Sequence, residues 1–147
     1  MASPIEQAAR ALLDKALAVT ATTEDGRTIQ AKGGRTGEGG PIRETPFIEI
    51  ADVGLDFEGI SATAGARDLV TLRLAVIFYR TYAKEVDREK EELRELFWAF
   101  RDAVRADYTL GGLVDYAHVA SARATLEPRE GQWYWAWITV VEVTFEA

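Results

Sequence analysis

Apolar residues recur at helical spacing in two parts of the chain. In the first part, from Ile5 to Leu17, they fall on one face of a helix that we expect to end near Val19. The residues Ser3-Pro4-Ile5-Glu6 have the sequence signature of a capping box, with proline at the first helical position. The second part, from Lys84 to Asp107, combines an apolar stripe with a densely charged opposite face. Two amphipathic helices are therefore predicted.

Four other segments alternate between apolar and other residues, as strands do when their two sides face different surroundings. They run from Pro46 to Val53, from Leu69 to Tyr82, from Ala117 to Leu126 and from Trp133 to Phe145. Turn residues occupy positions 127–131, so we expect the last two segments to pair as a hairpin. A shorter hairpin is predicted around Asp25-Gly26. The segments from Gly33 to Thr45 and from Gly54 to Gly65 lack periodicity and are predicted to be irregular.

This order of elements predicts an α+β fold in a single domain spanning residues 1–147. We expect a mostly antiparallel sheet of about four to five strands, with two main helices packed on one face and a closing C-terminal β-hairpin. A flexible Gly-rich loop is expected at about residues 32–45. A chain of this length is able to bury one substantial core.

The composition narrows the range of partners. The chain has 147 residues, with 17 Lys and Arg against 24 Asp and Glu, and a formal net charge of -7. Such a chain should be repelled by nucleic acid and by anionic membranes, because affinity for both comes mainly from Lys and Arg. The absence of cysteine excludes disulfides and thiolate metal sites. The sequence shows no apolar run of about 18 residues and no signal-peptide pattern, so we expect no membrane association.

The stretch KGGRTGEGG, residues 32–40, is rich enough in glycine to be compared with phosphate-binding loops. Gly34 to Gly39 has the glycine spacing of a Walker loop, but Gly40 and Pro41 stand where Lys and Ser or Thr are required. Glu38 would also place a negative charge against a phosphate. The dinucleotide-binding pattern fails as well. We therefore predict a surface loop rather than a nucleotide site.

Candidate catalytic residues are sparse. His118 is the only histidine, and Asp115 and Ser121 lie three residues to either side. In a regular strand His118 and Ser121 point to opposite faces, so this spacing does not predict a catalytic triad. A single histidine without cysteine is also a poor start for a metal site, which needs several nitrogen or sulfur ligands. We expect neither enzymatic activity nor a cofactor.

Three acidic residues, Asp52, Asp56 and Glu58, cluster near the second irregular segment. Carboxylate oxygens suit a hard cation, although the spacing of an EF-hand is absent. A solvated acidic loop is the favoured interpretation, and no metal is expected.

The tryptophans are the most distinctive residues. Trp133, Trp135 and Trp137 share one face of the last strand, in a stripe about 13 Å long. From Trp137 onward this face is predicted to belong to the core, whereas Trp133 and Trp135 lie near the turn, where large aromatic residues often serve interfaces. Trp98 lies off the centre of the apolar stripe of its helix. Together these positions favour a contact between subunits.

Two stretches resemble the tail terminator and tail completion proteins of long-tailed bacteriophages. They are RDAVRADYTLGGLVDYAHVASARATLEPREG at residues 101–131 and the last strand, WYWAWITVVEVTFEA. The most suggestive pieces are the turn D-x-T-L-G-G-L-V-D at Asp107 to Asp115 and the ending VEVTFEA. The resemblance covers about residues 42–147 and, in the order of elements, the N-terminal helix as well.

The resemblance implies a structural role without catalytic residues. Such proteins form a ring, usually of six copies, on the head-proximal end of the tail tube. The ring stops tube polymerisation and offers a surface that joins the capsid neck. The partners implied are further copies of the chain, the tail tube protein and a head–neck connector protein. The implied location is the virion tail, assembled in the cytoplasm of a bacterial host.

Positions for these contacts follow as hypotheses. The subunit or tube interface is predicted to include Gly34, Arg35, Gly37, Glu38, Gly39, Trp98, Trp133 and Trp135. An acidic ring lumen would let DNA pass without specific binding, by repulsion between like charges. The acids predicted to line it are Asp52, Asp56 and Glu58.

Three alternatives remain open at this point. The first is a neck or head-to-tail connector protein, which shares the general plan. The second is a monomeric ligand-binding module with an aromatic pocket built on the tryptophan stripe. The third is a small hydrolase or metal-dependent enzyme that uses the acidic segment.

Overall fold

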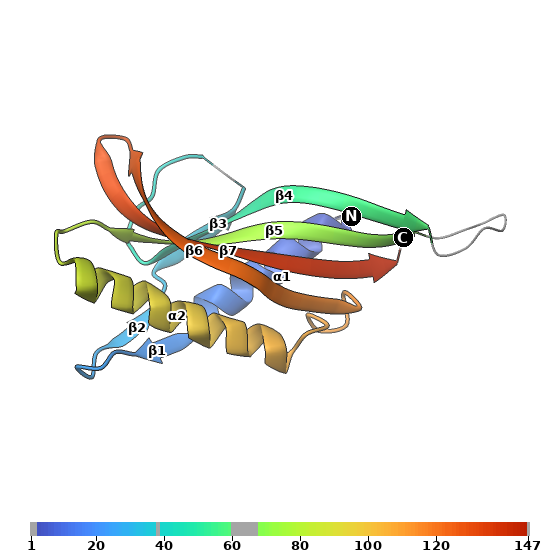
Figure 1. Ribbon diagram of the computed structural model, residues 1–147, viewed down its shortest axis with the longest axis horizontal. Coiled ribbons are helices and arrows are strands. Elements are labelled where there is room, and N and C mark those ends of the chain that lie inside the picture. Colours follow the sequence, from blue (N-terminus) through green and yellow to red (C-terminus); the bar gives the residue numbers. More distant parts are fainter. Residues whose placement is uncertain (1–2, 38, 60–67, 147) are drawn as a thin grey trace.

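The computed structural model describes residues 3–37, 39–59 and 68–146. In these ranges the chain forms two helices, a five-stranded sheet and a two-stranded sheet. The helices are α1 (Pro4–Ala18) and α2 (Val86–Ala106). The strands are β1 (Thr20–Thr22), β2 (Thr28–Gln30), β3 (Gly33–Thr36), β4 (Phe47–Gly59), β5 (Asp68–Thr81), β6 (Tyr116–Arg129) and β7 (Gln132–Glu146). Both helices lie on the same side of the larger sheet (Figure 1). The predicted α+β class is therefore confirmed.

The larger sheet is mixed and has the strand order β3-β4-β5-β7-β6. β3 runs parallel to β4, whereas the other neighbouring strands are antiparallel. The prediction of a mostly antiparallel sheet is thus corrected, because a parallel strand closes one edge. The predicted C-terminal hairpin is confirmed, since β6 and β7 pair along their length.

β3 occupies part of the segment that the sequence predicts to be a loop. A side-chain carbon at Gly34 would lie 2.7 Å from the carbonyl oxygen of Ile48 and 2.8 Å from a methyl group of Leu13. Glycine is therefore required where β3 approaches both β4 and α1. The prediction of a loop over residues 33–36 is wrong because Gly-Gly-Arg-Thr carries no apolar alternation.

The N-terminal signals act as predicted. The N–H of Glu6 donates to Ser3 Oγ at 3.2 Å, and the N–H of Ser3 donates to the Glu6 carboxylate at 3.4 Å, which completes the capping box. The turn at Asp25-Gly26 joins β1 to β2, and Gly26 adopts a φ of 85° that suits glycine. The predicted short hairpin is therefore confirmed.

α2 begins at Val86, slightly later than the predicted start at Lys84. The carboxylate of Glu89, which is fully buried, accepts backbone N–H bonds from Ala83 at 2.9 Å and from Glu85 at 2.6 Å. These bonds satisfy donors that the first helical turn leaves without partners. They also fix the path of the chain from β5 into the helix.

β4 is longer than the sequence predicts. The predicted strand stops at Val53, but β4 continues to Gly59, so the prediction of irregular structure is wrong for residues 54–59. The rest of that segment, residues 60–65, lies outside the described residues. The register with β5 shifts between Asp52 and Gly54, and this bulge breaks the alternation that a regular strand would show.

The main core lies between the sheet and the helices. Its side chains come from both helices and from the side of the sheet that faces them, called here the helix side. The predicted apolar face of β5 is confirmed, because its residues on the helix side are all buried: Val70, Leu72, Leu74, Val76 and Phe78. The other side, called here the helix-free side, carries a smaller buried cluster that includes Phe47, Ile77 and Tyr134. In the described ranges neither helix is long and apolar enough to cross a membrane.

Candidate functional site

The sheet has two open edges. At one edge β3 pairs only with Phe47 to Ile50, so in the part of the chain that the structure describes β4 pairs only with β5 from Ala51 onward, and its other edge is open. At the other edge β6 pairs with no strand other than β7, and the N–H of Ala117 near its start donates to the carbonyl oxygen of Tyr108 at 2.7 Å. An open edge presents unpaired backbone N–H and C=O groups that are able to pair with another chain. We call residues 51–58 the β4 free edge and residues 117–127 the β6 free edge.

The β4 free edge exposes large apolar side chains. Val53 is 55% exposed in the bulge, Leu55 is 40% exposed and Phe57 is 64% exposed. Leu55 faces Leu72 across the ladder and Phe57 faces Val70, which places both on the helix side. The far ends of β4 and β5 project past both helices (Figure 1), in agreement with the exposure of these side chains. Such a patch marks an interaction surface.

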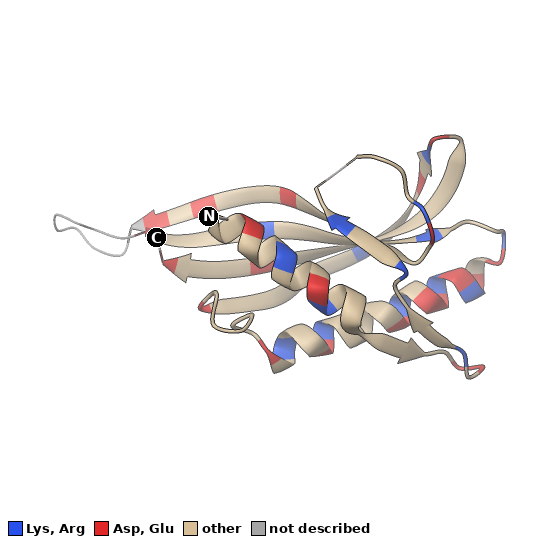
Figure 2. Ribbon diagram, turned by 180° about the vertical axis from the view of Figure 1, so that it is seen from behind, with Lys and Arg blue, Asp and Glu red and all other residues tan. Residues whose placement is uncertain are grey.

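The three acids predicted near a loop all lie on β4, and they divide between the two sides of the sheet. Asp56 and Glu58 face Thr71 and Leu69 on the helix-free side, whereas Asp52 faces Leu74 on the helix side. The carboxylate of Asp56 forms an ion pair with Arg73. Acidic residues of β4 and β7 gather at this end of the sheet (Figure 2). Among the described residues, no group of three or more His, Asp or Glu side chains is placed to hold a metal.

The β6 free edge has two chemically different sides. Its helix-side residues are small or apolar, because they face the core residues of β7: Ala117, Val119, Ala122, Ala124 and Leu126. Its helix-free residues are polar: His118, Ser121, Arg123, Thr125 and Glu127. β6 is therefore an amphipathic strand with one edge unpaired.

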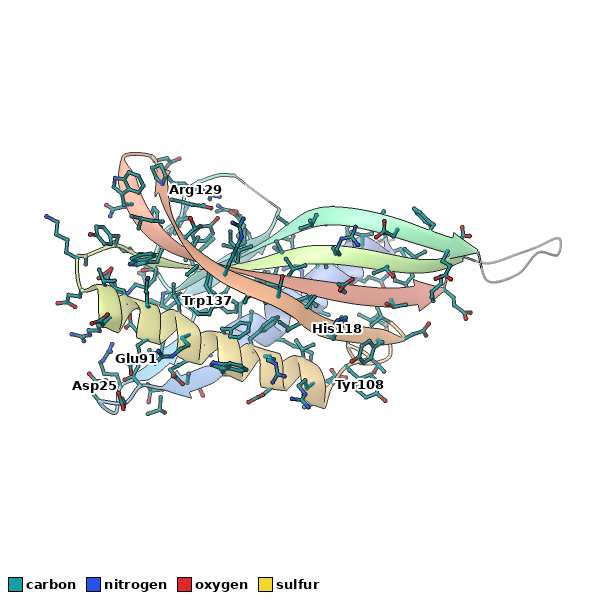
Figure 3. The ribbon with its side chains drawn as sticks, viewed as in Figure 1. Asp25, Glu91, Tyr108, His118, Arg129 and Trp137 are labelled. Atoms are coloured by element: carbon teal, nitrogen blue, oxygen red, sulfur yellow. The ribbon has the colours of Figure 1, made fainter. Side chains whose placement is uncertain are left out.

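The register of β6 corrects one prediction. A shift between Val119 and Ser121 places His118 and Ser121 on the same side of the sheet, not on opposite sides. His118 lies 3.8 Å from the Glu142 carboxylate, and its ring stacks on Tyr116 with 5.4 Å between centroids. Figure 3 shows His118 on the exposed strand β6. The surroundings of His118 thus consist of an acid and an aromatic ring at the surface.

The glycine-rich segment is tied to the sheet through Glu49, which is fully buried. Arg35 Nη2 donates to this carboxylate at 2.7 Å, and Arg129 Nη2 donates to it at 2.9 Å from the β6–β7 hairpin (Figure 3). Arg35 also donates to the carbonyl oxygens of Gly40 at 3.0 Å and of Pro41 at 2.7 Å. The two guanidinium groups hold the segment, the sheet and the hairpin together around one buried charge.

This arrangement changes the interpretation of the predicted loop contacts. Gly34 packs between β4 and α1, and Arg35 donates to Glu49, so both residues are half-buried within the subunit. Their part in a subunit or tube interface stays a prediction. Gly37 and Gly39 are exposed and adopt φ values of 94° and 86°. Glu38 lies outside the described residues.

Tyr79 completes the Glu49 cluster. Its hydroxyl donates to Glu49 at 3.4 Å and accepts from Arg129 Nη2 at 3.2 Å. Burial raises the pKa of Tyr79, and the negative charge of Glu49 raises it further. Hydrogen bonding to Glu49 raises the pKa of Arg129. The cluster therefore keeps a neutral phenol beside two cations and one carboxylate.

The tryptophans separate into surface and core positions. Trp98 and Trp133 are exposed, at 48% and 47%. Trp135 instead packs against the core, with Lys90 Nζ 4.5 Å from its ring centroid and Tyr82 in edge contact at 6.0 Å. Trp137 lies between the sheet and α2, where it meets Phe97 (Figure 3). Trp135 is thus partly buried against the core, whereas Trp133, on the same face of β7 but nearer the turn, is exposed. The interface roles of both residues stay predictions.

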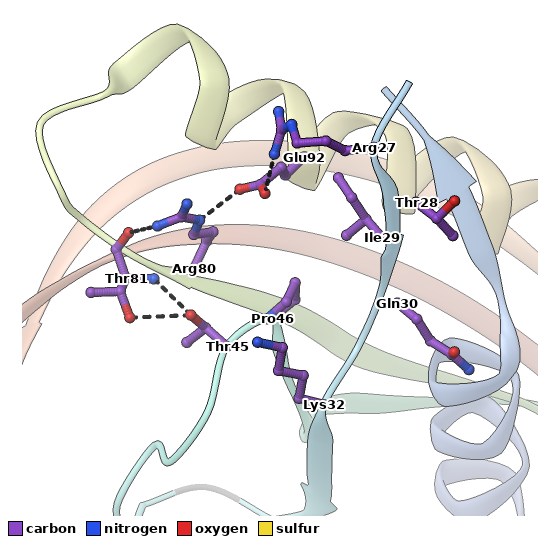
Figure 4. Close-up of a pocket in the computed structure, with 10 residues that line it drawn as sticks. All are labelled: Arg27, Thr28, Ile29, Gln30, Lys32, Thr45, Pro46, Arg80, Thr81 and Glu92. Atoms are coloured by element: carbon purple, nitrogen blue, oxygen red, sulfur yellow. Dashed lines mark hydrogen bonds and ion pairs between the residues drawn. The ribbon is translucent and has the colours of Figure 1, made fainter. Parts of the chain in front are cut away.

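A pocket of about 590 Å³ lies between β2, the beginning of β4 and α2 (Figure 4). Glu92 accepts from Arg27 at 2.7 Å and from Arg80 at 2.6 Å, and Lys32 adds a third cation to the lining. The lining also includes Thr28 and Gln30, and the hydroxyls of Thr45 and Thr81, which bond to each other at 3.1 Å. The pocket therefore presents positive charge rather than a nucleophile beside a free base.

The exposed apolar residues of the β4 free edge, Val53, Leu55 and Phe57, are absent from the contacts predicted from sequence. The alternation of Leu55 and Phe57 with Asp56 and Glu58 indicates that the strand continues beyond Val53. The bulge at Val53 shifts this alternation by one residue relative to residues 47–52, so the two parts do not read as one strand. The open edge of β6 has no sequence signal of its own, because it depends on the order of strands in the sheet.

In comparisons with known proteins, no protein-family model and no curated protein matches this chain.

Proposed function

We propose that this chain is a structural protein of a bacteriophage tail. It forms a homo-oligomeric ring, of six copies by its resemblance to tail terminators, that caps the head-proximal end of the tail tube. The ring ends tube polymerisation and provides the surface for joining the head. Its other partners are the tail tube protein and the head–neck connector protein, and its place is the virion.

The observation that carries this proposal is the pair of unlike open edges on one sheet. The β4 free edge exposes Val53, Leu55 and Phe57, and the β6 free edge is amphipathic. Two different surfaces on opposite edges of one subunit favour head-to-tail contacts, which close into a ring when the rotation between copies allows it. The resemblance of residues 42–147 to tail terminator proteins supports the same function independently.

The distribution of charge fits a ring through which DNA passes. Asp56, Glu58 and Glu142 lie on the helix-free side near the same end of the sheet. With that side facing the lumen, their carboxylates line the passage and repel the DNA backbone. Asp52 lies on the helix side, so it is no longer part of the proposed lining.

The test combines light scattering with negative-stain imaging of the purified chain, alone and with tail-tube subunits of the phage that encodes it. We expect closed rings of uniform size, and tubes whose growth stops at a bound ring. A chain that stays monomeric in the presence of growing tubes, and leaves their length unchanged, contradicts the proposal.

A further inference from the structure

We propose that the rings are closed by strand pairing, in which the β4 free edge of one copy pairs with the β6 free edge of the next. The pairing joins the five-stranded sheets into one continuous sheet around the ring. This inference rests on the proposed function, because it names the contact through which the copies assemble. The occupant of the β4 free edge is a second copy of this chain.

The strand directions are compatible with such a contact. β4 is antiparallel to β5, β5 to β7 and β7 to β6, so β4 and β6 run in opposite directions within one subunit. A second copy that continues the sheet in the same orientation therefore brings its β6 antiparallel to β4. Antiparallel addition of a strand to an open edge is an established way for proteins to associate. A groove of about 430 Å³ beside Gly37 and Asp52, where β3 ends, leaves room for the end of the added strand.

The helix sides of the two edges match in polarity. Leu55 and Phe57 project there from the β4 free edge and are exposed in the single subunit. The β6 free edge offers Ala122, Ala124 and Leu126 on the same side. Small and apolar side chains opposite large ones form favourable cross-strand pairs and remove the exposed apolar patch from water.

The helix-free sides match in charge. Asp56 and Glu58 project there from β4, and Arg123 projects there from β6. Pairing of β4 with a second β4 would instead place these acids against copies of themselves, which is unfavourable. Pairing of β6 with a second β6 brings two Arg123 residues together when it is centred on Arg123, but sets Arg123 opposite Glu127 when it is centred on Thr125. Charge therefore favours the contact between unlike edges over a contact between two β4 edges, and the unlike contact is the one that also covers the apolar residues of β4.

The match of polarity on the helix side and of charge on the helix-free side also limits the register between β4 and the β6 of the next copy. Placing Asp56 opposite Arg123 sets Leu55 opposite Ala124 and Phe57 opposite Ala122. A register shifted by two residues keeps every side chain on its side and sets Leu55 opposite Leu126. A shift by one residue reverses the sides and opposes apolar to charged residues, so it is excluded.

Disulfide trapping tests this contact directly, because the chain has no cysteine of its own. Leu55→Cys is combined with Ala124→Cys in one variant and with Leu126→Cys in a second, which covers both registers. The matched control combines Leu55→Cys with Thr125→Cys, whose side chain lies on the other side of β6. Paired strands place opposing Cα atoms about 4.5–5.5 Å apart, within the range that a disulfide spans.

Each variant is assembled under the conditions in which the wild-type chain forms rings, then oxidised and separated by mass without reductant. We expect covalent multimers in one of the first two variants, at a level at least tenfold above the control. Equal or absent cross-linking in all three variants overturns the edge pairing. Efficient dimer formation by Leu55→Cys alone also overturns it, because that result indicates a contact between two β4 edges.

Ring formation by the wild-type chain distinguishes failure of the edge pairing from failure of the proposed function. Rings without specific cross-links reject the edge pairing and leave the proposed function standing. If the wild-type chain forms no rings with tail-tube subunits, the proposed function fails, and the edge pairing fails with it.

Discussion

At the scale of single residues, the carboxylate of Glu49 has more structural partners than its position on one strand would suggest. It is fully buried and bonds to Arg35, Tyr79 and Arg129, which come from three separate segments. Desolvation of these charges is costly, so the cluster is stable only while every member is present. Its role is to hold the glycine-rich segment and the β6–β7 hairpin in fixed positions.

The variant Glu49→Gln tests this role. The substitution leaves two guanidinium groups without their shared carboxylate, and we expect the free energy of unfolding to fall by about 3–5 kcal/mol. Urea denaturation measures the change. Asp14→Asn, which also neutralises an acid but at an exposed position on α1, should change stability by less than about 0.5 kcal/mol. Equal stability of the two variants would show that the buried cluster is not required.

The raised pKa of Tyr79 predicts how the stability of the fold changes at alkaline pH. Its pKa is raised in the folded chain, first by burial and then by Glu49, so the folded state holds the phenol proton more tightly than the unfolded state does. The resulting stability is fully present below the unfolded pKa of about 10 and is lost as the pH rises above it toward the folded pKa. Tyr79→Phe should therefore show a shallower loss of stability between about pH 9 and 11.

Urea denaturation at several pH values in this range measures the slope. Tyr116→Phe is the matched control, because Tyr116 is exposed, and its slope should equal that of the wild-type chain. If Tyr79→Phe also keeps the wild-type slope, the phenol of Tyr79 is not held neutral by its surroundings.

At the scale of secondary structure, local signals predicted most of the fold. Alternation located β5 and β7, helical spacing located α1 and α2, and the capping box fixed the start of α1. β3 was missed because glycine signals flexibility in a sequence but here permits close packing of Gly34 against Ile48 and Leu13. The bulges in β4 and β6 were missed because a register shift depends on the neighbouring strand.

The same limit applies to the candidate site. The aromatic character of Trp98 and Trp133 was readable from the sequence, and both are exposed. The inward position of Trp135 was not, since it depends on which face of β7 the helices cover. Glu49, which joins Arg35 to Arg129, lies on a different strand from either arginine, so no local pattern indicates this link. Open edges arise only from the complete strand order.

Pairing of the β4 free edge with the β6 free edge predicts a result for mixed variants that pairing of two identical edges does not. Phe57→Lys blocks the β4 free edge with a charge, and Ala124→Lys blocks the β6 free edge, both at exposed positions. Each variant alone should fail to form rings while remaining folded. In an equimolar mixture one intact β4 edge meets one intact β6 edge, so we expect dimers with one copy of each variant and no larger species.

Mass measurement of the mixture and circular dichroism of each variant supply the readout. Asp14→Lys, an added charge on α1 away from both edges, should keep ring formation and serves as the control. Full rings from either blocked variant alone would mean that the copies associate through other surfaces.

At the scale of the whole molecule, the subunit has its main core on one side of the sheet and a group of three acids near one end of the other side. Both helices and the main core occupy the helix side, while Asp56, Glu58 and Glu142 occupy the helix-free side near one end. Such a subunit suits a closed ring with the helices outside and an acidic passage inside.

The central claim is that the chain closes into a ring on the end of a tail tube, and particle mass combined with imaging tests it most directly. Light scattering and negative-stain images of the chain with growing tail-tube subunits should show closed rings with the mass of six 16.3 kDa subunits, seated on tubes that have stopped growing. A chain that remains monomeric at 16.3 kDa, beside tubes that continue to grow, would contradict the account.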